Sequence, residues 1–216
     1  MELKIYQKAD DSEVYRLVGG GEYPRINTLD SFMKKIDLAA EPGFIERSSW
    51  VAGDVVEVRE REESSFHRFD GQAFQKCTFD PAAADSSAVM EVVYVAPNEY
   101  ARSLILNKSL PSMQNAVAGW IEFCYPWSDS AAIIANDEGK INGMELNRAL
   151  RDENGKIIDV IAGPFLIVGL TEDDCCSLSS EQMERYKMEF HQPERFLNLD
   201  GVLIAYKFNP AQSVHL

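Results

Sequence analysis

The stretch Ala88-Val89-Met90-Glu91-Val92-Val93-Tyr94-Val95 is nearly continuous in valine, methionine and tyrosine. A run of this length and composition predicts a strand that is covered on both faces of its sheet. It follows the segment from Asp80 to Ser87, which consists mainly of small residues and shows no apolar periodicity. We therefore predict two modules, residues 1–80 and residues 88–216, joined by a linker at residues 81–87.

The first module is predicted to be one helix on a small sheet. Apolar residues at helical spacing from Leu29 to Ala40 predict the helix, with Asn27 or Thr28 as its cap. The glycines at 19–21 predict a turn, and Asp70-Gly71 predicts a hairpin. Alternation of apolar and polar residues predicts strands at 2–7, 13–18, 54–59, 65–69 and 74–79.

The second module is predicted to combine more strands with two helices. Pro111 near the start and Gly119 beyond the end predict a short helix. Ser179, with Gln182 three residues later, predicts a capped helix that ends before Pro193. Further strands are predicted at 88–95, 120–125, 131–135, 156–160, 164–170 and 201–208, with the fourth and fifth of these forming a pair. The expected fold class is α+β: two small mixed α/β modules, each a predominantly antiparallel sheet with one or two covering helices.

The formal net charge of −14 is spread over the whole chain. Residues 1–87 carry 11 basic and 17 acidic side chains, and residues 88–216 carry 10 and 18. Because such a field repels phosphate and anionic lipid, we do not expect direct binding to nucleic acid or to membranes. No apolar run approaches the roughly 20 residues of a membrane span, and the N-terminal residues contain no signal-peptide core. We therefore expect a cytoplasmic protein, whose oligomeric state the sequence leaves open.

The sequence contains no catalytic or metal-binding template. It has no Gly-x-Ser-x-Gly elbow, and its only histidines are His67, His191 and His215. The four cysteines, Cys77, Cys124, Cys175 and Cys176, lack Cys-x-x-Cys spacing, and a calcium-binding loop is also lacking. We therefore predict no catalytic residues, no bound metal and no cofactor. Of the two readings, we favour a protein that is not an enzyme.

One set of polar residues between the predicted strands is the candidate site for a ligand or a partner. Asn and Asp residues of such a set can bond to their own backbone in turns, and its basic residues can neutralise neighbouring acids. Alternatively, the side chains converge at one end of the sheet and recognise a polar ligand or a partner, with Arg148 as a fork-shaped donor. The set comprises Asn136, Glu138, Lys140, Asn147, Arg148 and Asp159.

Two family resemblances cover most of the chain. Residues 136–140, 146–149 and 159–165 and the closing helix at 178–190 resemble an uncharacterised domain family of phage and conjugative-element proteins, over about residues 88–197. Residues 48–56 and 66–74 are similar to the YodL-like domains found in the same context. Neither family brings established catalytic residues, so the resemblance implies only a setting, that of accessory proteins of mobile DNA.

Two functional hypotheses follow. The first is a non-catalytic interaction protein of a phage or mobile element that binds a host or element protein and possesses an anti-defence or antirestriction role. An acidic surface that competes for the basic DNA channel of a DNA-handling enzyme would suit this role. The alternative is a protein that binds a small, nucleotide-like molecule, or an unrecognised enzyme, using the region from Asn136 to Asp159.

Overall fold

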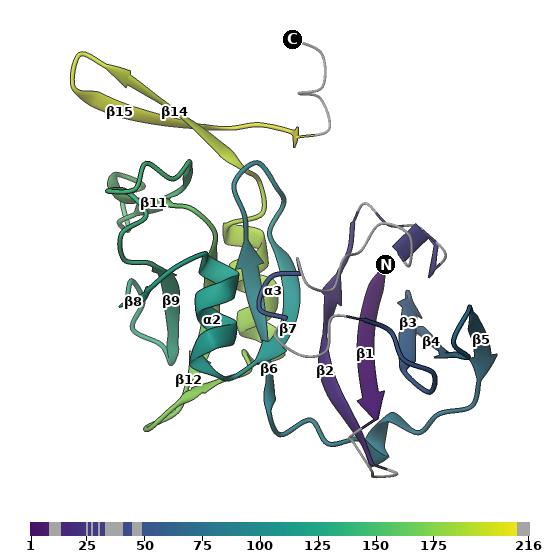
Figure 1. Cartoon of the computed structure of the whole chain (residues 1–216). Helices are drawn as coiled ribbons and strands as arrows, with labels where there is room; N and C mark the ends of the chain where they lie inside the picture. The colour runs from purple at the N-terminus through teal and green to yellow at the C-terminus, as the bar shows by residue number, and fades with distance from the viewer. Residues whose placement is uncertain are drawn as a thin grey trace. The chain divides into compact units, whose positions relative to one another are not determined.

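The computed structural model divides the chain into two compact units. Unit 1 contains Met1–Glu91 and Leu104–Asn115, and unit 2 contains Val92–Ser103 and Ala116–Leu216. The strands β6 and β7 and the helix α2 are therefore each shared between the units (Figure 1). The structure describes residues 1–8, 14–24, 26, 28–29, 31–32, 41–44 and 49–210.

Unit 1 is built on an antiparallel sheet in the order β5-β4-β3-β1-β2-β7. The strand β1 lies near its centre, with Ile5 opposite Val56 of β3 and Gly19 of β2. The predicted hairpin across Asp70-Gly71 is confirmed, since Phe69 pairs with Phe74. The bounds are β1 Glu2–Lys8, β2 Tyr15–Glu22, β3 Val55–Glu60, β4 Glu63–Phe69, β5 Phe74–Cys77 and β7 Arg102–Asn107, with a 3-10 helix at Pro81–Ala83.

The turn predicted at residues 19–21 is wrong, because β2 continues through these glycines to Glu22. Gly20 has a φ of +149°, and a Cβ there would lie 2.2 Å from the carbonyl oxygen of Leu3 on β1. The glycine is therefore required by the close approach of two paired strands rather than by a change of chain direction.

The helix predicted from Leu29 to Ala40 lies largely outside the described residues. Its start is visible, because Leu29, Ser31 and Phe32 are helical. The hydroxyl of Thr28 accepts a hydrogen bond from the amide of Ser31 at 3.1 Å, which confirms Thr28 as the cap.

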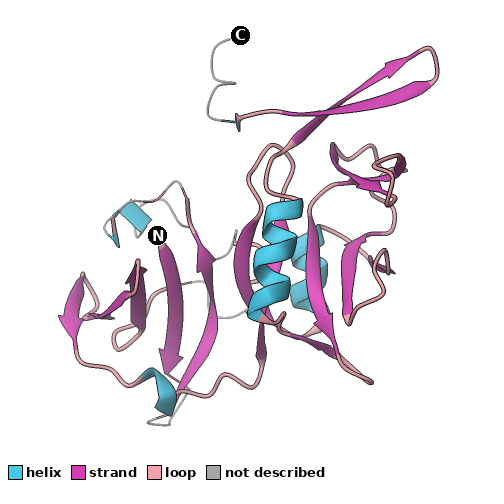
Figure 2. Cartoon of the chain, turned by 180° about the vertical axis from the view of Figure 1, so that it is seen from behind, coloured by secondary structure: helices cyan, strands magenta, loops and turns pink. Residues whose placement is uncertain are grey.

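Unit 2 has a sheet in the order β6-β12-β9-β8 and two separate two-stranded pairs, β10-β11 and β14-β15. The apolar run from Val89 to Val95 forms β6, in which all residues except Glu91 are buried. The helix α3 covers one face of this sheet, since Tyr186 and Phe190 pack in one buried cluster with Val93, Ile133 and Phe165 (Figure 2). The bounds are β6 Val89–Val95, α2 Leu110–Val117, β8 Ile121–Cys124, β9 Ala131–Asn136, β10 Leu146–Arg151, β11 Ile157–Ala162, β12 Phe165–Leu170, β13 Cys175–Cys176, α3 Ser180–Glu189, β14 Glu194–Leu199 and β15 Val202–Lys207.

The predicted α+β class is wrong, because the chain is predominantly β. Strands account for 46% of the described residues and helices for 13%, with α2 and α3 as the two α-helices longer than one turn among them. Four strands, β7, β10, β13 and β14, are not predicted from the sequence. The predicted pairing of residues 156–160 with 164–170 is also wrong, because β11 pairs with β10, whereas β12 pairs with β6 and β9.

Candidate functional site

The six predicted polar residues lie on three elements of unit 2. Asn136 ends β9, and Glu138 and Lys140 lie in the following turn. The neighbours Asn147 and Arg148 lie within β10, and Asp159 lies within β11. Asn136, Lys140 and Asp159 lie around a surface pocket, whereas Asn147 and Arg148 are buried near the end of α3. The Glu138 carboxylate belongs to neither group and accepts from the side chain of Asn142 at 3.3 Å.

Asn136 is a structural residue of the first group. Its side-chain amide donates to the carbonyl oxygens of Val117 and Ala118, at 3.3 and 2.9 Å, where α2 ends. Its side-chain oxygen accepts from the amide of Glu138 at 3.0 Å. A Cβ at position 119 would lie 2.2 Å from the Asn136 nitrogen, which explains the glycine there. The asparagine therefore satisfies carbonyls that the helix end leaves without partners.

Lys140 and Asp159 line a pocket of about 330 Å³ together with Asn136. The Lys140 ammonium lies 2.5 Å from the Asp159 carboxylate, and about half of each side chain is exposed. The same carboxylate oxygen accepts from the amide of Val160 at 2.7 Å. A ligand entering this pocket would therefore compete with contacts that the polar groups already make to one another.

Cys124 also lines this pocket, but its thiol is not activated. Burial raises its pKa, and the nearby carboxylates of Glu122 and Asp159 raise it further. Because the thiolate is the nucleophilic form, these surroundings disfavour nucleophilic chemistry at this cysteine.

Arg148 belongs to the second group and is buried, with 1% of its surface exposed. Its Nε donates to the carbonyl oxygen of Phe190 at 3.1 Å, and one Nη donates to that of Glu99 at 2.7 Å. The other Nη donates to the side-chain and backbone oxygens of Asn147, at 2.7 and 3.2 Å. The guanidinium therefore links β10 to the end of α3 and to the loop after β6.

Asn147 extends this network to the sheet that contains β6 and β12. Its side-chain amide donates to the carbonyl oxygens of Val95, at the end of β6, and Gly163, between β11 and β12, at 2.9 and 2.8 Å. Asn147 is 1% exposed. Because an unsatisfied buried carbonyl is costly, this side chain stabilises the junction of β6, β10 and β12.

Burial lowers the pKa of Arg148 to about 10, but two features stabilise its positive charge. The first is the carboxylate of Glu194, which opposes the effect of burial. Phe190 is the C-cap residue of α3, so the guanidinium lies at the negative end of the helix dipole. Glu194 itself accepts from the amide of Ala149 at 2.8 Å and forms an ion pair with Arg151 at 2.7 Å. Arg148 is therefore charged at neutral pH and serves architecture rather than an open binding surface.

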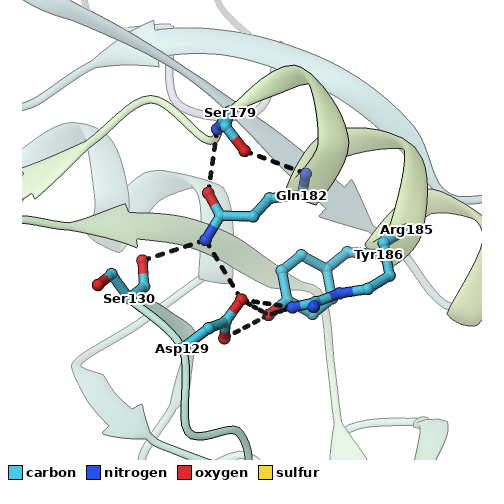
Figure 3. Close-up of polar contacts among 6 residues, drawn as sticks. All are labelled: Asp129, Ser130, Ser179, Gln182, Arg185 and Tyr186. Atoms are coloured by element: carbon cyan, nitrogen blue, oxygen red, sulfur yellow. Dashed lines mark hydrogen bonds and ion pairs between the residues drawn. The ribbon is translucent and has the colours of Figure 1, made fainter.

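A third polar cluster anchors α3 to the loop before β9 (Figure 3). The hydroxyl of Tyr186 donates to both oxygens of Asp129, at 2.8 and 2.9 Å, and Arg185 forms an ion pair with the same carboxylate. Gln182 donates to Asp129 at 3.3 Å and also completes the predicted capping box with Ser179, which is confirmed. Three side chains of α3 thus hold the carboxylate.

We expect an Asp129→Asn variant to lose about 1–2 kcal/mol of stability at neutral pH. Partial burial raises the pKa of Asp129, but hydrogen bonds from Tyr186, Gln182 and Arg185 outweigh burial and lower it overall. This contribution is therefore complete above the unfolded pKa near 3.9 and is lost as pH falls through the lower folded value. Urea unfolding of both proteins between about pH 2 and pH 7 would check this, since equal acid dependence would contradict it.

The sequence predicts only the second strand of the hairpin formed by β14 and β15, and it misses β14 and the pairing of the two strands. The register of the hairpin pairs Leu199 with Val202 across Asp200-Gly201. Asp200 has φ +52° and Gly201 has φ +85°, as a two-residue hairpin turn with positive φ at both positions requires. An Asp-Gly pair between alternating apolar residues is a strong hairpin signal, and it could have predicted the strand before it.

One face of this hairpin is apolar and exposed. We call this side the hairpin face. Cross-strand pairing places six residues on it: Arg195, Leu197, Leu199, Val202, Ile204 and Tyr206. Its five uncharged residues are Leu197 (49% exposed), Leu199 (55%), Val202 (62%), Ile204 (41%) and Tyr206 (42%). Figure 1 shows the hairpin extending beyond the sheet of unit 2. Contiguous exposed apolar groups of this kind mark interaction surfaces.

Across the described parts of the chain, no three His, Cys, Asp or Glu side chains gather as ligands of a metal ion would. None of the helices described is both long enough and apolar enough to cross a bilayer.

Comparison with known proteins supports the division of the chain into two domains. Residues 2–79 match the family model of the YodL-like domain, and residues 90–191 match that of a domain of unknown function, DUF3846. No curated protein and no solved structure matches the chain. The hairpin at Glu194–Lys207 lies beyond both matched stretches. The chain therefore carries a YodL-like domain followed by a DUF3846 domain, as the resemblances in its sequence predicted.

Proposed function

We propose that this protein is a non-catalytic accessory protein of a phage or mobile genetic element and that it acts by protein–protein interaction, in which the hairpin face takes part. The observation that supports this most strongly is the exposure of Leu197, Leu199, Val202, Ile204 and Tyr206 on one side of a single hairpin. A two-stranded hairpin is marginally stable alone in water, so a partner that covers its apolar side would stabilise it. A tyrosine and an arginine on the same face also suit the centre of a protein interface, where both residue types are enriched.

The proposed wider role is antirestriction in the cytoplasm, with a DNA-handling enzyme of the host as the target. The acidic balance supports this, because a protein with a net charge of −14 can compete with DNA for a basic channel. The chemistry of the described polar groups agrees with a role without catalysis. Arg148, Asn147 and Asp129 are each engaged in contacts within the chain, so none is poised to act on a substrate.

A photo-cross-linking experiment tests whether the hairpin face contacts proteins. With p-benzoyl-phenylalanine in place of Tyr206, illumination of cells that carry the element should yield covalent adducts heavier than the chain. The same group in place of Ile158, an exposed residue of β11, should give no such adducts. Absence of any adduct at position 206, or equal yields at both positions, would count against the proposal.

A further inference from the structure

We infer that the hairpin face binds the same face of a second copy of this chain, so that two hairpins pack face to face about a twofold axis. This inference rests on the proposed function, since it names the partner of the surface proposed there. Three features of the hairpin support it: its sidedness, the order of its charges and the size of its exposed area.

The two sides of the hairpin differ in their surroundings. The pairs Glu194–Lys207 and Phe196–Ala205 lie on the side opposite the hairpin face. Glu194, Ala205 and Lys207 line a cleft of about 690 Å³ whose other walls come from β10, the loop after it and the end of α3. The third pair on that side, Asn198–Leu203, is exposed toward the tip. That side therefore faces the rest of unit 2 at the base of the hairpin, whereas the hairpin face is exposed along its whole length.

The charges of the hairpin are arranged so that two copies complement each other. Arg195 lies at the base and Asp200 lies in the turn at the tip. The guanidinium of Arg195 lies over the ring of Phe208, 4.5 Å from its centroid. Neither Arg195 nor Asp200 forms an ion pair with any residue that the structure describes.

A twofold axis that lies between the two faces, over the central pair Leu197–Ile204 and perpendicular to the strands, brings the base of each hairpin over the tip of the other. Arg195 lies two residues from this centre, at about 7 Å, and Asp200 lies three residues away, at about 10 Å. The remaining few ångströms are within the reach of an arginine side chain. Each copy would thus place Arg195, the single basic residue of its hairpin face, near Asp200 at the tip of the other copy. The leucine, isoleucine and valine side chains would pack between the two faces.

The exposed area suits a modest, self-complementary interface. Two such faces would together bury on the order of 1,000 Å², which is at the lower end of specific interfaces. The net charge of −14 on each copy opposes association, although salt at physiological strength screens this repulsion beyond about 8 Å. We therefore expect reversible dimerisation that depends on protein concentration.

Sedimentation of the full chain over a concentration series, up to about 200 µM, tests this inference. The chain should pass from monomer to dimer. An Ile204→Asp substitution should weaken dimerisation by at least about 100-fold, because each dimer would bury two uncompensated carboxylates. Ile158→Asp is the matched control, since Ile158 is also an exposed strand isoleucine, and it should dimerise like the unchanged chain. Circular dichroism of both variants verifies that they are folded.

Charge reversal tests the orientation of the two copies. Arg195→Glu and Asp200→Lys should each weaken dimerisation by about 10-fold, and the double variant should recover most of this loss. Asp200→Asn, which keeps a residue suited to the positive φ of the turn, separates loss of charge from loss of the turn. Recovery in the double variant supports the twofold packing, and additive losses overturn it.

A chain that remains monomeric over the whole series, or an Ile204→Asp variant that still dimerises, overturns the inference. If the purified chain is monomeric while position 206 still cross-links to a different protein, the proposed function stands and the second copy is excluded as the partner. If position 206 yields no adduct and the purified chain is monomeric, both fail.

Discussion

Replacing Arg148 with methionine should lower the free energy of unfolding of unit 2 by about 3–5 kcal/mol. The methionine retains apolar volume but removes every hydrogen bond from the guanidinium to Glu99, Asn147 and Phe190. Those oxygens would lose their guanidinium donor, and the end of α3 would lose its compensating charge. Urea unfolding followed by hydrogen exchange in β10 and α3 would measure the loss.

Lys140→Met provides the matched control for this prediction. Lys140 also forms an ion pair within the candidate site, with Asp159, but about half of its side chain is exposed. Its replacement should therefore lower the free energy of unfolding by no more than about 1 kcal/mol. If Arg148→Met were as mild as Lys140→Met, the guanidinium would not be structural, and Arg148 would again be a candidate for recognising a ligand.

Replacing Gly20 with valine should destabilise unit 1 by about 3 kcal/mol or more. The φ of +149° is unfavourable for a β-branched residue, and the added Cβ would overlap the carbonyl oxygen of Leu3. Because β1 lies between β2 and β3, the shift needed to relieve this overlap would disturb both pairings. Thermal unfolding and hydrogen exchange of β1 amides would report the effect.

Gly53→Ala separates backbone strain from steric overlap. Gly53 has φ +107° but no atom within 4 Å of its added Cβ, so substitution there should cost only about 1–2 kcal/mol. Equal losses at positions 20 and 53 would show that the close approach of β1 and β2 is not what requires the glycine.

Local sequence signals predicted the elements whose structure depends on neighbouring residues. The Asp70-Gly71 hairpin and the capping box of Ser179 with Gln182 both occur where they were predicted. Both are closed by hydrogen bonds within a few residues, so the chain encodes them locally. Asp200-Gly201 is a signal of the same kind, and the strand before it was missed although this signal was present.

The candidate site could not be predicted in the same way, because its geometry depends on distant segments. Leu146-Asn147-Arg148-Ala149-Leu150-Arg151 is rich in good helix formers, yet it forms the strand β10. Partners such as Val95, Phe190 and Glu194 lie more than 40 residues away in the sequence, and they satisfy the buried polar groups of this strand. Tertiary context therefore overrode local preference.

The sequence by itself determined the two-domain order, the acidic balance and the buried strands, since composition and periodicity carry that information directly. The tertiary structure alone decided that Arg148 is buried and satisfied, whereas Leu197, Ile204 and Tyr206 are exposed. A charged residue can be buried only where distant carbonyls surround it, and an apolar strand stays exposed only where the fold leaves one side uncovered. Both outcomes depend on which segments meet in space.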